Sequence, residues 1–263
     1  MKKVAVVTGG TRGIGRGCVC ALYDAGCTVY ECSRHDFAFP EAIHLDLDVS
    51  DEKAFAKVIS DIVKKEGRID ILVNNAGMGI SGAAEFTENA DAHKIVEINL
   101  FGVVNGCKAV IPYMREQGGG RIVNTSSLAA PIAIPFQSWY SVTKAAVSSY
   151  TASVANEVRP FGITLAAVLP GDTKTGFTKA REKSEVGDDI YEGRIARAVG
   201  VMEHDEQTGM SAEAAGAFLA GIALKKKVKP EYCIGFKNTI LYLVAKFLPC
   251  GLRNRILYLI YAK

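Results

Sequence analysis

Short apolar runs along the chain alternate with longer segments in which apolar residues recur at helical spacing. The early runs are continuously apolar, which is typical of parallel strands covered on both faces. The strands expected from these runs are Val4–Val7, Thr28–Cys32, Ile43–Leu47, Ile71–Val73, Ile122–Thr125, Thr164–Leu169 and Cys233–Gly235. This alternation predicts a single α/β domain over residues 1–263, with a doubly wound parallel sheet in three α/β/α layers.

Long helices are expected over residues 51–66, 92–115 and 138–159. The first has an apolar stripe at helical spacing, and Ser50 is expected to cap its N-terminus. Residues 173–214 break the strand–helix rhythm because they are polar and mixed in character. We expect this segment to be an insertion over the edge of the sheet.

Composition narrows the class of protein. The net charge of the 263 residues is +3, which is nearly balanced and does not indicate a nucleic-acid partner. The seven cysteines include no C-x-x-C pair and the four histidines are scattered, so neither a disulfide framework nor a metal site is expected. Glycines break the N-terminal apolar stretch, which argues against a signal peptide, and no segment is expected to reach the length of a membrane span. A cytoplasmic location is therefore expected.

A glycine-rich turn follows the first strand, in the stretch VAVVTGGTRGIGRG. Gly9, Gly13 and Gly15 lie between that strand and the start of a helix. Glycine permits the tight turn and a close approach of the backbone to a pyrophosphate, and the helix N-terminus offers free N–H groups. The spacing G-x-x-x-G-x-G in this context favours phosphate binding over an ordinary loop.

Five motifs occur in order along about two thirds of the chain: TGGTRGIG, NNAG, NTSS, YSVTK and PGDTKTGF. With them the chain resembles a short-chain dehydrogenase/reductase of the compact, single-domain branch. The resemblance implies a Rossmann-type fold, a nicotinamide cofactor and the interconversion of alcohols and ketones. It also implies a catalytic set of Asn99, Ser127, Tyr140 and Lys144.

The chemistry of that set follows from its residue types. Tyr140 and Lys144 are four residues apart and share a helix face. A free phenol has a pKa of about 10, and we expect the neighbouring ammonium, with an oxidised nicotinamide ring, to lower it enough for proton transfer. Ser127, preferred over Ser126 by its spacing from Tyr140, would stabilise charge on the reacting oxygen. The resemblance gives Asn99 a water-linked proton path beside the lysine.

The cofactor is expected to be NADP(H) in preference to NAD(H). At the end of the second strand, Ser33 stands where NAD-dependent relatives carry an acid that holds the ribose hydroxyl. Arg34 follows it and Arg12 lies in the glycine turn, and guanidinium groups match phosphate oxygens. Glu31 is expected to face a different environment.

The resemblance assigns further cofactor contacts to residues near the strand ends. Asp48 and Val49 would flank the adenine, and the NNAG motif would line the central part of the cofactor. The full expected set is Gly9, Thr11, Arg12, Gly13, Ile14, Gly15, Ser33, Arg34, Asp48, Val49, Asn74, Asn75, Ala76, Gly77, Tyr140, Lys144, Pro170, Gly171, Thr173 and Thr175.

Apolar residues near the expected site suggest a hydrophobic carbonyl or alcohol, such as a steroid, a retinoid or a lipid-derived ketone. They are Met78, Ile80, Leu128, the stretch 130–136, Trp139, Phe177, Met202 and Met210. By resemblance, residues 173–214 would form a substrate lid. Two other functions stay open, an NADP-binding redox sensor without turnover and a sugar-nucleotide epimerase or dehydratase.

The C-terminal segment 238–263 is basic, aromatic-rich and amphipathic, and no acidic residue follows Glu231. Pro249 and Gly251 divide it into two short helix candidates. It is expected either to lie on an anionic membrane surface or to pack on its own domain or on another subunit. The resemblance also suggests a homodimer or homotetramer formed through the long helices.

Overall fold

The structure is a computed structural model that describes residues 2–35 and 39–263. Its centre is a seven-stranded sheet in the order β11-β7-β6-β4-β1-β2-β3, with every pair of neighbours parallel. The strands are β1 (Val4–Thr8), β2 (Thr28–Ser33), β3 (Ile43–Asp46), β4 (Ile71–Asn74), β6 (Gly120–Thr125), β7 (Ile163–Leu169) and β11 (Glu231–Cys233). The chain runs outward from β1 in one direction and from β4 in the other, so the strand order reverses between these two. This is the expected doubly wound sheet, and a ligand crevice is expected at that reversal.

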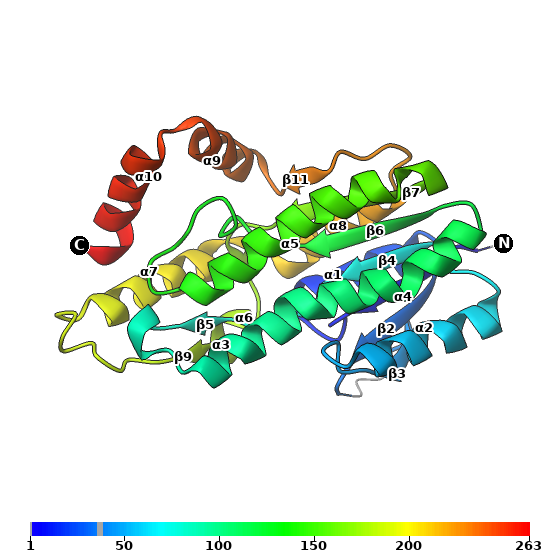
Figure 1. Cartoon of the computed structure of the whole chain (residues 1–263), viewed down its shortest axis with the longest axis horizontal. Helices are drawn as coiled ribbons and strands as arrows, with labels where there is room; N and C mark the ends of the chain where they lie inside the picture. The colour runs from blue at the N-terminus through cyan, green and yellow to red at the C-terminus, as the bar shows by residue number, and fades with distance from the viewer. Residues whose placement is uncertain (1, 36–38) are drawn as a thin grey trace.

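Helices cover both faces of the sheet, as Figure 1 shows. On one face α1 (Gly13–Asp24) packs against α8 (Ala212–Leu224). The other face is covered by α2 (Glu52–Glu66), α4 (Gly102–Glu116) and α5 (Ser138–Glu157). The three layers of a single Rossmann-type domain are therefore confirmed.

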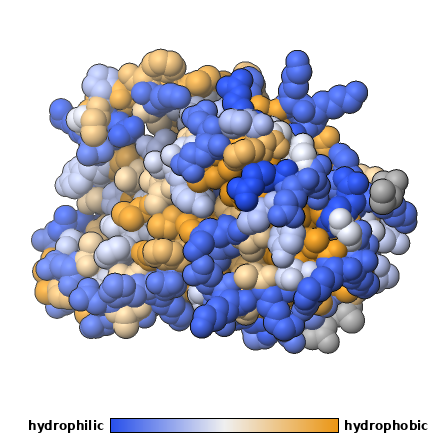
Figure 2. Space-filling view, turned by 45° about the vertical axis from the view of Figure 1, so that its right-hand side comes forward, coloured by the Kyte–Doolittle hydropathy of each residue, from blue (hydrophilic) through white to orange (hydrophobic). Residues whose placement is uncertain are grey.

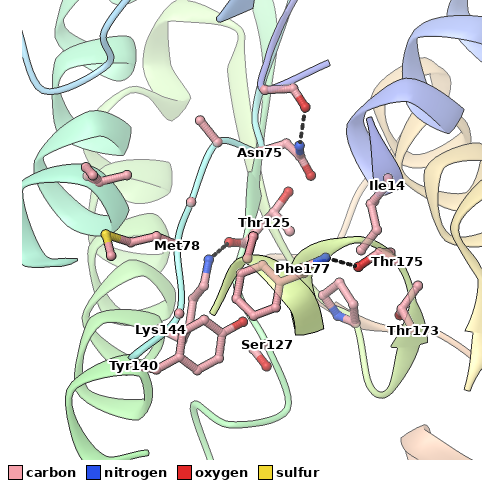
Figure 3. A pocket seen from close by; sticks show the side chains of 18 of the residues that line it. Ile14, Asn75, Met78, Thr125, Ser127, Tyr140, Lys144, Thr173, Thr175 and Phe177 are labelled. Carbon is pink, nitrogen blue, oxygen red and sulfur yellow. Dashed lines mark hydrogen bonds between the residues drawn. The ribbon is translucent and has the colours of Figure 1, made fainter. Parts of the chain in front are cut away.

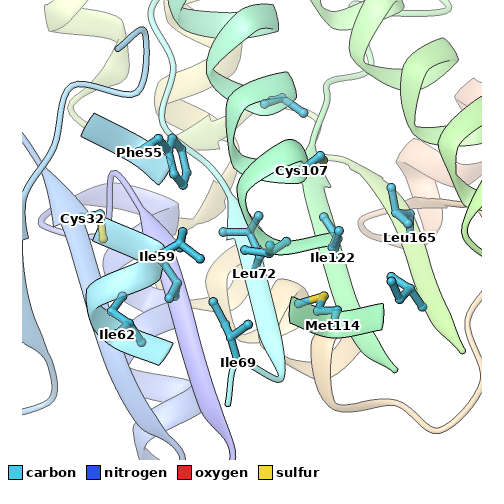
Figure 4. Close-up of a cluster of buried hydrophobic side chains, with 14 of the residues drawn as sticks. Cys32, Phe55, Ile59, Ile62, Ile69, Leu72, Cys107, Met114, Ile122 and Leu165 are labelled. Carbon is cyan, nitrogen blue, oxygen red and sulfur yellow. The ribbon is translucent and has the colours of Figure 1, made fainter. Parts of the chain in front are cut away.

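The strand β1 shows why the early apolar runs are continuous. Val4 and Val6 belong to the hydrophobic cluster under α2, α4 and α5, whereas Ala5 and Val7 belong to the cluster under α1 and α8. Successive side chains of a strand point to opposite faces, so a strand between two helical layers needs apolar residues throughout. Figure 4 shows the first cluster, in which Phe55 and Ile59 of α2 lie over the sheet.

Two local expectations are wrong. Asp51, and not Ser50, caps α2, because its carboxylate accepts the Ala54 N–H at 2.9 Å. Ser50 instead donates its hydroxyl to Asp48 at 2.6 Å. The last strand of the sheet is Glu231–Cys233, which overlaps the expected Cys233–Gly235 at a single residue.

The helix expected over 92–115 is longer and interrupted by one wide turn. It consists of α3 (Asn89–Val96), the π-helical turn η2 (Glu97–Phe101) and α4. By length and mean hydropathy alone, the continuous stretch Asn89–Glu116 could cross a membrane, which corrects the expectation that no segment is long enough. The core helix of a soluble protein passes the same test of length and hydropathy. In this stretch, Val103 and Cys107 lie in the hydrophobic core of the domain.

The remaining elements lie at the edges of the sheet and beyond its last strand. They are β5 (Ile80–Ser81), η1 (Ala84–Phe86), η3 (Arg159–Phe161), β8 (Thr173–Lys174), α6 (Phe177–Ala180), β9 (Glu182–Lys183), α7 (Arg194–Thr208), β10 (Met210–Ser211), α9 (Phe236–Phe247), α10 (Cys250–Leu257) and the π turn η4 (Tyr258–Ala262). Most of the segment 173–214 thus forms short strands, α6, α7 and the first turn of α8. The C-terminal segment forms the two expected short helices, which arch over the domain at the top of Figure 1.

Candidate active site

A cavity of about 840 Å³ lies at the carboxyl ends of the central strands, where the strand order reverses. This volume is in the range of small-molecule and cofactor sites. All the predicted catalytic and cofactor residues line the cavity except Gly15, Asn74 and Asn99. The lining residues from that set are Gly9, Thr11, Arg12, Gly13, Ile14, Ser33, Arg34, Asp48, Val49, Asn75, Ala76, Gly77, Ser127, Tyr140, Lys144, Pro170, Gly171, Thr173 and Thr175.

The glycine turn is packed too closely for larger residues. Gly9 and Gly13 have φ of 64° and 57°, a region that favours glycine. A Cβ on Gly15 would lie 2.2 Å from the Gly9 carbonyl oxygen. The first turn of α1 therefore packs directly against the backbone of the glycine turn. The helix α1 that follows has no side-chain cap, which leaves its first N–H groups free at the cavity. These residues therefore fit the pyrophosphate of a dinucleotide.

Glu31 does not face the cavity, in agreement with expectation. Its side chain is fully buried, accepts the Gly10 N–H at 2.9 Å and lies 2.6 Å from Nδ1 of His44. Through its bond to the Gly10 N–H, Glu31 fixes the glycine turn to strand β2. The cavity wall at the end of β2 is formed instead by Cys32, Ser33, Arg34 and His35.

Tyr140 and Lys144 lie side by side in the first turns of α5, and both face the cavity. The Lys144 Nζ is 5.6 Å from the centroid of the Tyr140 ring and donates to the Thr125 carbonyl at 2.9 Å. Figure 3 shows the Tyr140 hydroxyl on the side of Ser127, with the Lys144 ammonium above the ring and bonded to Thr125. The shared helix face expected from the four-residue spacing is therefore present.

The electrostatics of this pair differ from expectation. Burial raises the pKa of Tyr140 to about 12, against a smaller lowering by its hydrogen bond with Ser127. Burial also lowers the pKa of Lys144 to about 8. The expectation that the lysine lowers the tyrosine pKa is thus not met by the protein groups alone, because desolvation of the phenolate outweighs the contacts that stabilise it.

Ser126 and Ser127 have different surroundings. The Ser126 hydroxyl is buried, donates to the Lys144 carbonyl at 2.9 Å and lies 2.8 Å from the Ser148 hydroxyl. The Ser127 hydroxyl accepts the Ala129 N–H at 3.1 Å and bonds Tyr140. Ser127 is therefore the serine placed beside the phenol, and Ser126 ties β6 to α5.

Asn99 lies in the π turn η2, behind the cavity wall. Its side-chain amide accepts the Met78 N–H at 2.8 Å and donates to the Met78 carbonyl at 2.9 Å. Wide π turns often occur at functional sites, and this one aims Asn99 at the loop after β4. Asn74 departs from expectation, because it is buried and bonds Asn124 at 2.9 Å without reaching the cavity.

Several residues that the sequence did not single out also line the cavity. Glu206 of α7 lies at the wall, where its carboxylate accepts the Thr178 hydroxyl at 2.6 Å and pairs with the buried Arg181. Gln137, Leu241 and Tyr261 line it as well. No sequence signal marks them, because they come from separate segments that only the fold brings together. Among the expected apolar residues, Ile80, Trp139 and Met210 do not reach the wall.

Comparison with known proteins identifies the family. The family model described as short chain dehydrogenase matches residues 3–186. The chain belongs to the short-chain dehydrogenase family. It is therefore an oxidoreductase of a family that binds nicotinamide dinucleotides and small-molecule substrates and whose members are commonly oligomeric.

Relatives in the short-chain dehydrogenase family cover nearly the whole chain. The chain is 34% identical to a 3-ketodihydrosphingosine reductase of Bacteroides thetaiotaomicron, over 99% of this chain and 98% of the relative. A short-chain dehydrogenase of Streptomyces avermitilis has a similar structure, with a TM-score of 0.85, 29% identity and coverage of 97% and 94% of the two chains. Other solved relatives carry either cofactor. ElxO has NADP bound (28% identity, TM-score 0.74), and a 3-ketoacyl-(acyl-carrier-protein) reductase of Brucella melitensis has NADH (25% identity, TM-score 0.74).

Proposed function

We propose that this protein is an NADP(H)-dependent reductase or dehydrogenase that interconverts a hydrophobic ketone or aldehyde with its alcohol. One observation carries the proposal. Tyr140, Lys144 and Ser127 meet on the wall of one cavity, between the glycine turn and an apolar chamber. A proton donor, a cation and a hydroxyl are what the reduction of a carbonyl needs beside a bound hydride donor.

In this proposal each residue has a separate task. Tyr140 gives its proton to the carbonyl oxygen in reduction and takes it from the alcohol in oxidation. Ser127 donates a hydrogen bond to the same oxygen as negative charge develops on it. Lys144 supplies positive charge beside the phenol. Asn99 holds the Met78 backbone in the loop after β4 through two hydrogen bonds. The nicotinamide, when bound, supplies or accepts the hydride.

Arg12, Ser33 and Arg34 support the choice of NADP(H). All three line the cavity, and no carboxylate from β2 faces it, because Glu31 is turned to Gly10 and His44. Asp48 lies nearby, but its carboxylate is occupied by Ser50, and hydrogen bonds from Ser50, then the charge of Arg34, hold its pKa low. Two guanidiniums on the cavity wall, with Glu31 turned away and the Asp48 carboxylate bonded to Ser50, favour a ribose phosphate.

The chamber beside Tyr140 supports a hydrophobic, lipid-like substrate. Its apolar wall consists of Met78, Leu128, Ile132, Ile134, Phe177 and Met202. The Phe177 ring packs 5.7 Å from that of Tyr140, centroid to centroid. The relative from Bacteroides is named for a long-chain keto substrate, which agrees with such a chamber. We assign the lid over it to residues 173–214, which contribute Phe177, Met202 and Glu206 to the wall.

We also propose that the protein forms a homo-oligomer and acts in the cytoplasm. A homodimer or homotetramer through the long helices is supported by Phe101 and Val142, which expose 44% and 53% of their surface on η2 and α5. The reaction proposed above would take place in the cytoplasm.

The variant Tyr140→Phe tests the proposed reaction. Loss of the proton donor is expected to reduce turnover of a hydrophobic ketone about 10²–10⁴-fold with NADPH binding retained. Turnover is followed at the nicotinamide absorbance, and binding by nicotinamide fluorescence. Tyr150→Phe, on the same helix but outside the cavity lining, is the matched control. Unchanged turnover in Tyr140→Phe would contradict the proposal.

A further inference from the structure

The C-terminal helices α9 and α10, together with the turn η4, carry most of the exposed large hydrophobic residues in the described part of the chain. On α9 they are Phe236, Ile240, Leu241, Leu243, Val244 and Phe247, and on α10 and η4 they are Leu252, Ile256, Tyr258, Leu259 and Ile260. Apart from Leu241 and Tyr258, the residues of each set follow the i, i+3, i+4, i+7, i+8 spacing of one helix face, so each set forms a stripe. Phe236 and Phe247, at the two ends of α9, are 82% and 81% exposed.

These helices have a second, inward face that attaches them to the domain. Ala245 and Leu257 are buried with Ile132 and Tyr261 in one small hydrophobic cluster. Tyr242 packs on another cluster with Leu128 and Leu169. The exposed stripes are therefore not the faces that hold the helices in place. In Figure 2 hydrophobic side chains lie along the upper edge of the molecule, the edge where Figure 1 places α9 and α10.

The charges of this segment have one sign. Lys237, Lys246, Arg253, Arg255 and Lys263 are its only charged side chains, and no acidic residue follows Glu231. An isologous contact between two copies would place the same cationic patch against itself, which is unfavourable. An anionic lipid surface matches both features of this segment. Its phosphate groups can bind the cations, and its acyl chains can bury the apolar stripes.

The same helices border the cavity. Leu241 lines the cavity wall and is also 47% exposed, and Tyr261 lines the wall from the turn η4. The apolar surface and the chamber beside Tyr140 therefore meet at one helix.

We propose that the outward faces of α9 and α10, with η4, dock on an anionic membrane surface and present the mouth of the cavity at Leu241 to the lipid. Docking itself does not depend on the reaction. Entry of a lipid-like ketone from the membrane past Leu241 rests on the proposed function.

Co-sedimentation of the full-length protein with lipid vesicles tests docking without turnover. Wild type is expected to pellet with phosphatidylcholine vesicles that contain phosphatidylglycerol, and to bind pure phosphatidylcholine at least about fivefold more weakly, since each surface cation contributes about that factor. Phe236→Glu and Phe247→Glu should each weaken binding about tenfold or more, because an aromatic side chain that docking would bury in the lipid is replaced by an anion. Arg255→Glu should weaken it about fivefold or more.

The matched controls are Val186→Glu and Ile190→Glu, which place the same charge on exposed apolar residues outside this segment. They should bind the vesicles as wild type does. An absence of wild-type binding, or equal loss in the controls, would overturn the proposal. So would dissociation of a wild-type oligomer by Phe236→Glu and Phe247→Glu in sedimentation velocity, because the face would then be a subunit contact.

Turnover separates the two proposals. The Phe236→Glu and Phe247→Glu variants should reduce a water-soluble ketone at the wild-type rate and a vesicle-borne ketone more slowly. Failure of all ketone reduction would count against the proposed function, whereas vesicle binding would still decide docking.

Discussion

The two halves of the cavity are built in different ways. The half proposed to bind the nucleotide, at the ends of β1, β2 and β4, contains the glycine turn, where a Cβ on Gly15 would strike the Gly9 carbonyl. The substrate half is made of side chains from distant segments, such as Phe177, Met202, Leu241 and Tyr261. There Gly176 has open space around its Cα and a φ of −69° that any residue can adopt. The first half therefore has no room for a side chain at Gly15, whereas the second has room for one at Gly176.

After the loss of turnover in Tyr140→Phe, the next largest expected effect lies where the two halves meet, at the serine pair. Ser127→Ala should lower kcat about 10²–10³-fold, because a hydrogen bond to the reacting oxygen is lost, while Tm stays unchanged. Ser126→Ala should instead lower Tm by about 2–4 °C, because buried bonds to the Lys144 carbonyl and to Ser148 are lost at about 1 kcal/mol. Steady-state kinetics and thermal melting of both variants check this. A reversed pattern would assign the reacting oxygen to Ser126.

A smaller effect is expected in the nucleotide half at Arg34. Wild type should use NADPH in strong preference to NADH. Arg34→Asp should shift the ratio of the two kcat/KM values toward NADH about 10–100-fold, because a charge-assisted hydrogen bond to the phosphate is replaced by repulsion. Lys53→Asp, on the exposed side of α2, is the control for the change in charge. Equal use of both cofactors by the wild type would remove the assignment.

Glycine substitutions compare the rigidity of the two halves directly. Gly15→Ala should destabilise the protein by about 1–3 kcal/mol and lower Tm by several degrees, because its Cβ has no room. Gly176→Ala, also at the cavity, should leave Tm unchanged or raise it slightly, since it only restricts the unfolded chain. Differential scanning calorimetry measures both. Equal melting temperatures would show that the glycine turn adapts more easily than its packing indicates.

The last expected effect is a pH dependence of stability from Lys144. Burial lowers its pKa from 10.5 to about 8, so between these values the unfolded chain holds a proton that the folded protein has released. Unfolding takes up protons in this range, and the contribution of Lys144 to stability rises with pH. The Tm of wild type relative to Lys144→Met should therefore increase from pH 8 to pH 10. A constant difference would place the lysine in a more polar environment than its 5% exposure implies.

The sequence alone determined the sheet, its two helical layers and the nucleotide half of the cavity. Continuous apolar strands, the glycines of the turn and the spacing of Tyr140 and Lys144 are local patterns, and each reflects a constraint that acts within a few residues. The errors there are small, such as Asp51 in place of Ser50 as a helix cap, since neighbouring polar residues can serve equally well.

Only the tertiary structure decided the substrate half and the burial of the reactive pair. Glu206, Leu241 and Tyr261 come to the cavity from segments whose packing depends on the whole fold, and no local pattern marks them. Desolvation likewise depends on every element around a group. Burial therefore raises the pKa of Tyr140, whereas the sequence led us to expect that Lys144, with an oxidised nicotinamide ring, lowers it. The outward faces of α9 and α10 became visible for the same reason, because a helix with two apolar faces shows which one is free only after the other has packed.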